Sequence, residues 1–426
     1  MKVKTIIISA LCALAGATGA RALTLDGALD AALKNSPAVN MAREAASAQQ
    51  YRKYGARVSR LGEVTAIGNL TRYNLDRTLT PMVPPIKPPF PLSDDTITNV
   101  GGSYTLPLFT GFKLSRNISI AGLSAAIAKA QSSLTEQQVR FNVYSLFLKG
   151  LALKEQLQAK SEQEKALAEL HKNIELGAQI GRYASIDLKK VAYQYEMVKA
   201  QRQALENNIA SLKAGLDQLT GLTSDDWDFE PADLKDKDYP PLEDLIKTAL
   251  VDREEMTISE KKKRIAAANY SKSKYAYLPE ISANYTYIRS IGGGGSVPLW
   301  NYGLAAQWSV FDFGKRAFDM VSQKQEYKSA EQAETAQQLA VRRDVIEAYN
   351  SLQSQRALHE AAAKALSYAK EAKEVENLKY QQNAGSMYDL LFSIAQYYDA
   401  LSQERGAYYG VFTAGKYLEL NAGEKI

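Results

Sequence analysis

Two stretches in each half of the chain alternate apolar and polar residues with a period of two, the pattern of a β-strand with one buried and one wet face. The alternation is clearest in 280–290 and 302–311, where aromatic and aliphatic residues share one face. Residues 64–70 and 100–108 keep the same alternation. The sequence therefore predicts four strands, at 61–73, 98–108, 278–290 and 301–311. A soluble four-stranded sandwich alternates equally well, so both architectures stay open at this point.

Long stretches without proline follow each pair of strands and are rich in Ala, Leu, Lys, Glu and Gln. Residues 114–179 and 315–382 each predict a helix of roughly 100 Å, at about 1.5 Å per residue. No compact domain needs such a helix, whereas coiled coils and spacer tubes do. These segments therefore favour an elongated helical assembly.

A shorter helix after the first long one carries a seam with alternating spacings of three and four residues. The seam consists of Leu188, Val191, Tyr195, Val198, Arg202, Leu205, Ile209, Leu212, Leu216 and Leu219. This heptad pattern predicts left-handed coiling against a neighbouring helix. Arg202 is its one charged member, and its stem can cover apolar surface while its head reaches water.

The order helix, strand, loop, strand, long helix, helix occurs twice, and single residues recur at fixed offsets. Leu25 recurs as Leu242, an offset of 217, and Phe109 recurs as Phe311, an offset of 202. The sequence therefore predicts two structural repeats. They are 23–221 and 241–426, joined by a linker at 222–240.

The change in offset lies in the loop between the first two strands, 74–97. This loop holds six prolines and fits neither a central strand nor a helix. Its counterpart, 291–300, contains a short glycine turn. A length difference confined to one loop is what two copies of a fold tolerate.

The first 22 residues predict a cleaved export signal rather than part of the fold. Lys2 and Lys4 give a basic start, 6–17 is apolar or small, and Ala20 and Ala22 stand where a signal peptidase reads small residues. The apolar stretch is shorter than the roughly 20 residues of a membrane-spanning helix. A soluble N-terminal helix is the alternative.

Candidate chemistry is sparse. Cys12 is the only cysteine and lies inside the expected signal, so the mature chain is expected to hold no thiol. Lipidation of Cys12 is disfavoured because Leu11 precedes it. His171 and His359 stand singly on long helices, and no Ser/His/Asp order or phosphate loop is present. The sequence therefore predicts no enzyme and no catalytic, cofactor or metal site.

The whole chain carries a net charge of +5, to which the signal contributes Lys2, Lys4 and Arg21, leaving +2. Basic and acidic residues look interleaved along the helices, which indicates a solvated surface rather than a nucleic-acid footprint. No nucleic acid is therefore expected among the partners.

Past the signal, no apolar run reaches the roughly 18 residues that a membrane helix shows, so a membrane crossing would require strands. Four strands cannot close a barrel, and open edges in lipid leave backbone groups unpaired. Three copies supply twelve strands, an even number and a circle wide enough for a lumen. The residues alone thus predict a membrane-embedded oligomer with a long helical stalk.

Several short motifs, in this order on a duplicated plan, resemble the TolC-like outer-membrane efflux proteins over essentially the whole mature chain. They are Asn35-Ser36-Pro37, Leu106-Pro107-Leu108-Phe109-Thr110-Gly111, Tyr277-Leu278-Pro279, Ser309-Val310-Phe311-Asp312-Phe313-Gly314-Lys315-Arg316 and Gly385-Ser386-Met387-Tyr388-Asp389-Leu390. The resemblance implies a mixed α and β membrane protein, a homotrimer with a twelve-stranded β-barrel, four strands per chain, continuous with a long α-helical periplasmic tunnel. The linker at 222–240 would lie in an equatorial belt, and the loop 74–97 would be extracellular.

The same resemblance implies a function. The chain would be the exit duct, in the cell outer membrane, of a tripartite efflux pump or a type I secretion system. It would dock to a periplasmic adaptor (membrane fusion) protein and an inner-membrane pump, and would export small molecules or proteins. A structural coiled-coil envelope protein without channel activity is the competing class. That alternative explains the helices but not the alternating strands or the proline-rich loop.

In such proteins a gate closes the periplasmic end of the tunnel, and carboxylates ringing a lumen favour cations. The gate candidates implied here are Asp187, Asp389, Arg182, Tyr183 and Tyr388. The chain departs from the usual pattern of a second nearby acid, because Lys190 and Phe392 stand at those positions. Helix N-terminal capping is the alternative role for both aspartates.

Gly111 and Gly314 lie where a strand turns into a long helix, a bend that β-carbons resist. A flexible surface loop is the alternative at both positions. Aromatic residues near the strand ends are candidates for an interfacial girdle, with ordinary core aromatics as the alternative. These are Tyr285, Trp300, Tyr302 and Trp308.

Overall fold

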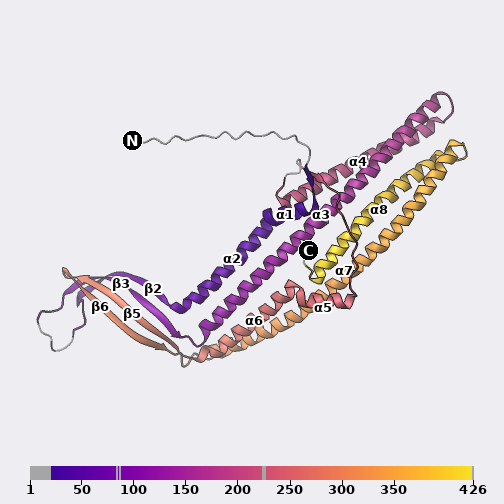
Figure 1. Cartoon of the computed structure of the whole chain (residues 1–426). Coiled ribbons are helices and arrows are strands. Elements are labelled where there is room, and N and C mark those ends of the chain that lie inside the picture. Colours follow the sequence, from indigo (N-terminus) through magenta and orange to yellow (C-terminus); the bar gives the residue numbers. More distant parts are fainter. Residues whose placement is uncertain (1–20, 83–84, 86–87, 223–226, 425–426) are drawn as a thin grey trace, which may run out of the picture. The chain divides into compact units, whose positions relative to one another are not determined.

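The computed structural model describes residues 21–82, 85, 88–222 and 227–424 (Figure 1). The strands are β1 (Arg21–Leu23), β2 (Glu63–Thr78), β3 (Ser93–Phe109), β4 (Trp227–Phe229), β5 (Glu280–Gly292) and β6 (Gly295–Gln307). The helices are α1 (Leu25–Asn35), α2 (Pro37–Val58), α3 (Lys113–Gln179), α4 (Ser185–Thr220), α5 (Leu242–Asp252), α6 (Glu254–Lys274), α7 (Lys315–Gln381) and α8 (Met387–Ala422). Two single 3-10 turns, η1 (Ser59–Leu61) and η3 (Tyr275–Tyr277), precede β2 and β5.

The chain forms two compact units, each assembled from both predicted repeats. The sheet unit comprises Met41–Thr135 and Ile246–Arg343. The helical unit comprises Met1–Asn40, Glu136–Leu245 and Asp344–Ile426. The long helices α3 and α7 each contribute residues to both units, which explains why the units do not coincide with the repeats.

The sheet unit contains one four-stranded antiparallel sheet in the order β2-β3-β5-β6. Its register aligns Val64, Tyr104, Tyr285 and Tyr302 in one row across the four strands. The adjacent row, on the other face, holds Thr65, Ser103, Thr286 and Asn301. The predicted alternation of an aromatic face with a polar face is therefore present in the sheet.

The strand boundaries differ from those predicted, because both hairpins pair closer to their turns. Strand β2 continues to Thr78 and β3 begins at Ser93, so the loop is shorter than the predicted 74–97. The predicted loop 291–300 is wrong: Gly293 and Gly294 alone form a tight turn, with φ of 58° and 75°. Pro298 lies within β6, opposite Arg289 of β5. Strand β6 then ends at Gln307 instead of 311.

The long helices match in length between the two halves of the chain. Helices α3 and α7 each have 67 residues, and α4 and α8 each have 36. In α4 the predicted seam is packed: Val191, Val198 and Leu216 are almost fully buried. The guanidinium of Arg202 donates to Glu164 of α3 at 2.6 Å and also pairs with Glu206 of α4. The charged seam residue is thus neutralised within the helical unit.

The main core of the helical unit forms around Phe147 and Leu148 of α3, Leu216 of α4, and the linker residues Trp227 and Phe229. Strand β4 holds these two aromatic residues in place by pairing in parallel with β1. A β-carbon at Gly150 would collide with the Phe229 ring, so glycine is required at this crossing. The predicted linker therefore packs against the helices.

The predicted signal lies outside the described residues as far as residue 20. Its last two residues, Arg21 and Ala22, belong to β1 and pair with Trp227 and Asp228.

Charge is distributed unevenly, and the interleaving expected from the sequence is wrong at the scale of the units. The sheet unit contains 26 basic and 15 acidic residues, a net charge of +11. The helical unit contains 26 basic and 32 acidic residues, a net charge of −6. The linear sequence conceals this difference because each unit is built from segments far apart in the chain.

Within the described part of the chain, no helix combines the length and the apolar character needed to cross a membrane.

Candidate functional site

The candidate site lies at the two helical turns of the helical unit, between α3 and α4 and between α7 and α8. At the first turn Gly181 has a φ of 78°, and the backbone N–H of Arg182 donates to the carbonyl of Gly177 at 2.8 Å. This arrangement lays the Tyr183 ring against Gly177, where a β-carbon would collide with it. The Arg182 guanidinium lies 5.5 Å from the centre of that ring. Arg182 and Tyr183 therefore form one packed corner.

An aromatic stack joins the two turns. The rings of Tyr183 and Tyr380 are 5.8 Å apart and nearly parallel, at 15°. Tyr380, near the end of α7, is 9% exposed and belongs to a small core with Ile174, Met387 and Leu390. Burial, together with the nearby Tyr183 and Asp187, raises the pKa of Tyr380 to about 12. Its hydroxyl is buried without a hydrogen-bond partner.

The two candidate aspartates occupy the same place in their helices but have different contacts. Asp187 lies in the first turn of α4, and Lys190 donates to its carboxylate at 3.3 Å. Asp389 lies in the first turn of α8, where Ser386 is the capping residue. The Ser386 hydroxyl accepts from the Asp389 N–H at 3.1 Å and donates to the carboxylate at 2.6 Å.

These contacts show whether each aspartate lies beside a helix cap, the role that the sequence left open for Asp187 and Asp389, and the result differs between them. At α8 the Ser386 side chain caps the helix by accepting the Asp389 N–H, and the Asp389 carboxylate accepts from the same hydroxyl. At α4 the N-cap position is Ala184, which has no side-chain acceptor. Asp187 therefore favours its helix only through the helix dipole. It is also the aspartate held by a cation on its own helix.

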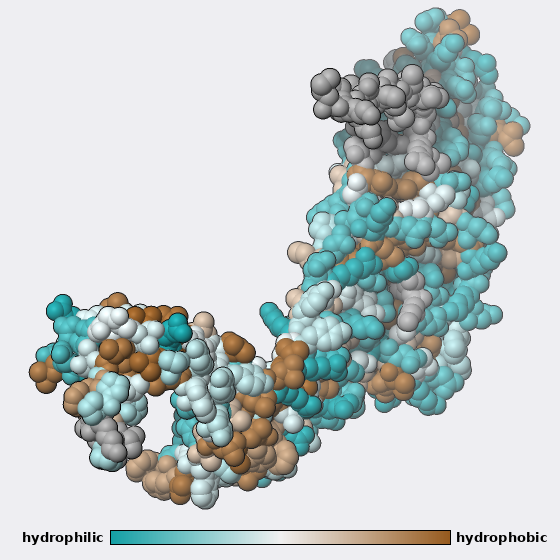
Figure 2. All heavy atoms as spheres, turned by 60° about the vertical axis from the view of Figure 1, so that its left-hand side comes forward, coloured by the Kyte–Doolittle hydropathy of each residue, from teal (hydrophilic) through white to brown (hydrophobic). Residues whose placement is uncertain are grey.

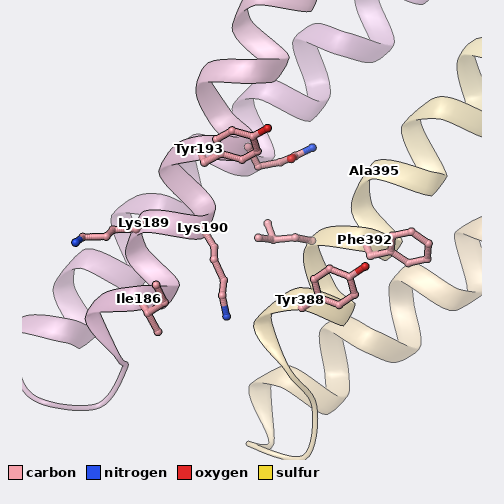
Figure 3. A pocket seen from close by; sticks show the side chains of 9 residues that line it. Ile186, Lys189, Lys190, Tyr193, Tyr388, Phe392 and Ala395 are labelled. Atoms are coloured by element: carbon pink, nitrogen blue, oxygen red, sulfur yellow. The ribbon is translucent and has the colours of Figure 1, made fainter.

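A groove of about 450 Å³ runs between α4 and α8 next to these aspartates (Figure 3). It is lined by Ile186, Lys189, Lys190, Tyr193, Gln194, Tyr388, Leu391, Phe392 and Ala395. Tyr388 is 65% exposed and stacks on Phe392 at 6.1 Å. Figure 3 shows Lys190 extending between the helices, whereas Lys189 points away from α8. The groove thus combines exposed aromatic surface with positive charge.

The candidate turn glycines lie in a second pair of turns, in the sheet unit. Gly111 and Phe112 both have positive φ, 56° and 61°, and so do Phe313 and Gly314, 54° and 88°. Each strand-to-helix turn therefore needs two consecutive left-handed residues, and glycine supplies only one of them. Sequence reasoning missed the two phenylalanines. The offset of 202 aligns Gly111 with Phe313 and Phe112 with Gly314, and that exchange was the available signal.

Each of these turns is closed by a polar residue just before the left-handed pair. The Thr110 hydroxyl accepts from the Leu114 N–H at 3.2 Å. Asp312 accepts from the Arg316 N–H at 3.1 Å and from its guanidinium at 2.7 Å. The long helices α3 and α7 therefore begin at defined residues.

The aromatic residues proposed for a girdle are solvent-accessible on the sheet unit. Trp300 and Tyr302 stack at 6.1 Å and are 63% and 76% exposed. Trp308 lies beyond the end of β6 and donates to the Tyr277 carbonyl at 2.9 Å. Tyr285 pairs with Tyr302 across the sheet. None of the four belongs to the buried core of the described chain.

His359 of α7 lies 3.4 Å from Glu404 of α8 and against the Tyr408 ring. Among the described residues, no three His, Cys, Asp or Glu side chains gather in a way that could hold a metal ion.

Comparison with known proteins gives a consistent result. The sequence model of a family described as outer membrane efflux protein matches residues 28–222 and 245–421. The Campylobacter jejuni CmeC outer membrane channel superposes with a TM-score of 0.80 at 16% identity, covering 94% of this chain and 85% of that one. The Vibrio cholerae outer membrane protein VceC gives 0.77 at 14%, with 94% and 96% covered. The Neisseria gonorrhoeae MtrE outer membrane channel, in its open state, gives 0.76 at 15%, with 94% and 89% covered. No curated protein sequence matches the chain.

Proposed function

Because the family match covers most of its length, the chain belongs to the outer membrane efflux protein family, and from this premise we propose how its residues build and close the exit duct. The resemblance and the fold class predicted from the sequence are thereby confirmed: long helices combined with a small antiparallel sheet. The protein is an efflux channel of the outer membrane and not an enzyme. Channels of this family act as homotrimers with an adaptor and an inner-membrane pump.

The proposal for assembly rests on the two free edges of the sheet. Strands β2 and β6 each pair on one side only within the described chain. Because the four strands alternate in direction, β6 of one copy meets β2 of the next in the antiparallel sense. Exposed edges cannot persist in lipid, where backbone groups find no water. Three copies joined in this way give a closed ring of twelve strands.

We assign the gate to the two helical turns of the helical unit. The observation that carries this assignment is the Tyr183–Tyr380 stack, which joins the α3–α4 turn to the α7–α8 turn. Arg182 rests on the same stack, and Asp187 and Asp389 begin the two returning helices. A three-fold axis through these turns would gather six carboxylates. Opening would require the stack to separate.

The groove between α4 and α8 is the proposed docking surface for the adaptor. Its exposed Tyr388, Phe392 and Ile186 offer apolar surface, and Lys189 and Lys190 add positive charge. An amphipathic helix with an apolar face and acidic flanks fits this combination. The particular adaptor and pump set the cargo, either small molecules for efflux or proteins for type I secretion.

The mature chain, reconstituted in planar bilayers, tests the proposal. Discrete unitary conductance is expected, with block by multivalent cations applied from the helical side. Asp389→Asn should weaken that block about tenfold, because each ring loses three charges. Glu371→Gln, an exposed acid further along α7, should leave block unchanged. Discrete conductance with identical block in all three proteins would remove Asp389 from the lumen. No conductance at all would favour a structural envelope protein.

A further inference from the structure

The positive charge of the sheet unit is concentrated in three segments that contain no aspartate or glutamate. These segments are 45–62, 96–135 and 261–279, and together they hold 13 lysines and arginines. Within each segment no acidic residue interrupts the basic ones, although Glu44 of α2, Glu136 of α3 and Glu260 of α6 lie just beyond the segment ends. Half of the unit's 26 basic residues, and none of its acidic ones, therefore lie in these three segments.

The three segments meet at one rim of the sheet. Helix α2 and η1 end just before β2, α3 starts just after β3, and α6 and η3 end just before β5. The register pairs Glu63 with Thr105 and Phe109 with Ile281, which brings these strand ends to the same rim. The basic residues of these three segments that lie within about two helical turns of that rim form what we call the basic collar. The collar consists of Arg57, Arg60, Lys113, Arg116, Lys272 and Lys274.

Most of the collar has no carboxylate partner. Lys113 pairs with Glu280, Lys272 donates to the neutral Asn117 side chain at 3.3 Å, and Lys274 lies 4.1 Å above the Tyr270 ring. For Arg57, Arg60 and Arg116 no ion pair occurs with any described residue. At the opposite rim Arg72 pairs with Asp95 at 3.4 Å, and Arg77 lies over the Tyr73 ring at 4.7 Å. The collar rim gathers more basic residues without a carboxylate partner, because three helices bring them there.

Aromatic residues interleave with the collar. Tyr51, Tyr54, Phe112, Tyr275 and Tyr277 are all more than a third exposed. Phe112 and Tyr275 contact each other at 5.2 Å, so the aromatic residues bridge the segments as the basic residues do. In Figure 2 apolar residues gather over the sheet and its end, beside hydrophilic surface on the helices. Such a border of amphipathic rings and cations is the composition of a membrane–water interface.

We propose that the basic collar binds anionic phospholipid headgroups of the periplasmic leaflet, and so fixes the depth of the channel in the membrane. This inference rests on the proposed membrane-spanning function of the sheet. The helices leave the sheet at the collar rim and lie in the periplasm, so the leaflet at that rim is the periplasmic one. Phosphodiester headgroups match clustered lysines and arginines that lack internal partners.

A polar groove beside the collar is large enough to admit part of a headgroup. It has a volume of about 490 Å³ and is lined on α3 and α6 by Lys113, Asn117, Lys272 and Ser273. On α7 it is lined by Arg316, which is paired with Asp312, and by Asp319 and Glu326, so a phosphate would sit on the α3 and α6 side. The amide and hydroxyl groups there can bond the glycerol part of phosphatidylglycerol.

The test variant removes charge only from α3 and α6, the helices that adjoin the inner strands β3 and β5. It leaves unchanged the edge strands β2 and β6, where copies would meet. Arg116→Gln, Lys272→Gln and Lys274→Gln are combined in the full mature chain. The matched control combines Lys262→Gln, Lys324→Gln and Lys328→Gln, which removes the same charge from the same unit. Lys262 is ten residues from Lys272 along α6, about 15 Å. That distance exceeds the Debye length of about 8 Å at physiological salt.

Native mass spectrometry of the detergent-solubilised channel then counts retained phosphatidylglycerol against phosphatidylcholine. The wild type and the control should prefer phosphatidylglycerol at least tenfold, and the preference should shrink in high salt. The collar variant should lose most of this preference while keeping its single-channel conductance. A preference that survives in the collar variant, or falls equally in the control, overturns the proposal. Stronger binding of lipopolysaccharide that is lost in the same variant would overturn the assignment to the periplasmic leaflet. Absent conductance in the wild type would contradict the channel function instead.

Discussion

Tyr380 carries a hydroxyl that is buried at the helix tips without a partner. Removing it in Tyr380→Phe keeps the stack on Tyr183 and relieves an unpaired polar group, so the free energy of unfolding should rise by about 1 kcal/mol. Tyr409→Phe is the matched control, because its hydroxyl donates to Glu155 at 2.6 Å and its loss should destabilise by about 1–3 kcal/mol. Chemical denaturation followed by helical circular dichroism measures both. Equal destabilisation by the two substitutions would show that Tyr380 has a partner in solution.

The same tyrosine gives a pH dependence with a definite sign. The pKa of Tyr380 is raised to about 12, whereas an unfolded tyrosine titrates near 10. Its contribution to stability is therefore fully present below about pH 10 and is lost as the pH rises toward 12. Stability of the wild type should fall more steeply across that window than stability of Tyr380→Phe. Parallel curves from pH 9 to 12 would contradict the burial of this group.

Single residues of the candidate site were only partly predictable from the sequence. Asp187 and Asp389 could be placed at helix starts, since their position in the two repeats is equivalent. Tyr380 was not predicted, because its stacking partner Tyr183 is almost 200 residues away and no local sequence pattern indicates the contact. The docking groove escaped for the same reason: Ile186 and Phe392 become neighbours only when α4 and α8 pack together.

At the scale of elements, the strand-to-helix turns hold two left-handed residues each, and this predicts opposite effects of neighbouring substitutions. Phe313 has a φ of 54° and is 89% exposed, so Phe313→Gly should stabilise the turn by about 1 kcal/mol. Gly111→Ala should destabilise by at least that amount, because its β-carbon would approach the Tyr275 carbonyl at 3.1 Å. Thermal unfolding of the detergent-solubilised protein checks both. Stabilisation by Gly111→Ala would rule out the left-handed turn.

The start of α8 supplies a second prediction at this scale. Ser386→Ala removes the side chain that caps the helix and bonds Asp389, so it should cost about 1 kcal/mol locally. Hydrogen exchange of the first-turn amides, including that of Asp389, should accelerate about fivefold. Ser393→Ala, deeper in the same helix, is the control and should leave those amides unchanged. Unaltered exchange in Ser386→Ala would contradict the capping of α8 by the Ser386 side chain.

Elements were more predictable than their ends. The long helices follow from proline-free stretches and begin within a residue or two of where the sequence placed them. The strands follow from alternation, but their ends near the hairpins did not, because Asp, Arg and Ser residues of low strand propensity still pair there.

At the scale of the whole molecule, the closed ring of three copies requires β2 of one chain to lie beside β6 of the next. A Cys12→Ser background with Ala66→Cys in β2 and Trp300→Cys in β6 places one thiol near each edge. In one chain two strands separate these positions, whereas in a ring the strands that carry them are direct neighbours across an interface, where a flexible bismaleimide linker can join the two thiols. Treatment of the membrane-inserted protein should give a covalent species of three chains.

The control places both thiols on inner strands, with Val100→Cys in β3 and Tyr287→Cys in β5. These strands are adjacent within one chain, so crosslinking there should leave a monomer on denaturing gels. Variants with a single edge cysteine should likewise give no trimer, since each interface would then hold one thiol only. A ladder beyond three chains would indicate an open, head-to-tail array. An open array leaves the backbone groups of β2 and β6 unpaired at its two ends. It would therefore contradict the proposal that every strand edge in the membrane is hydrogen-bonded to a neighbouring strand.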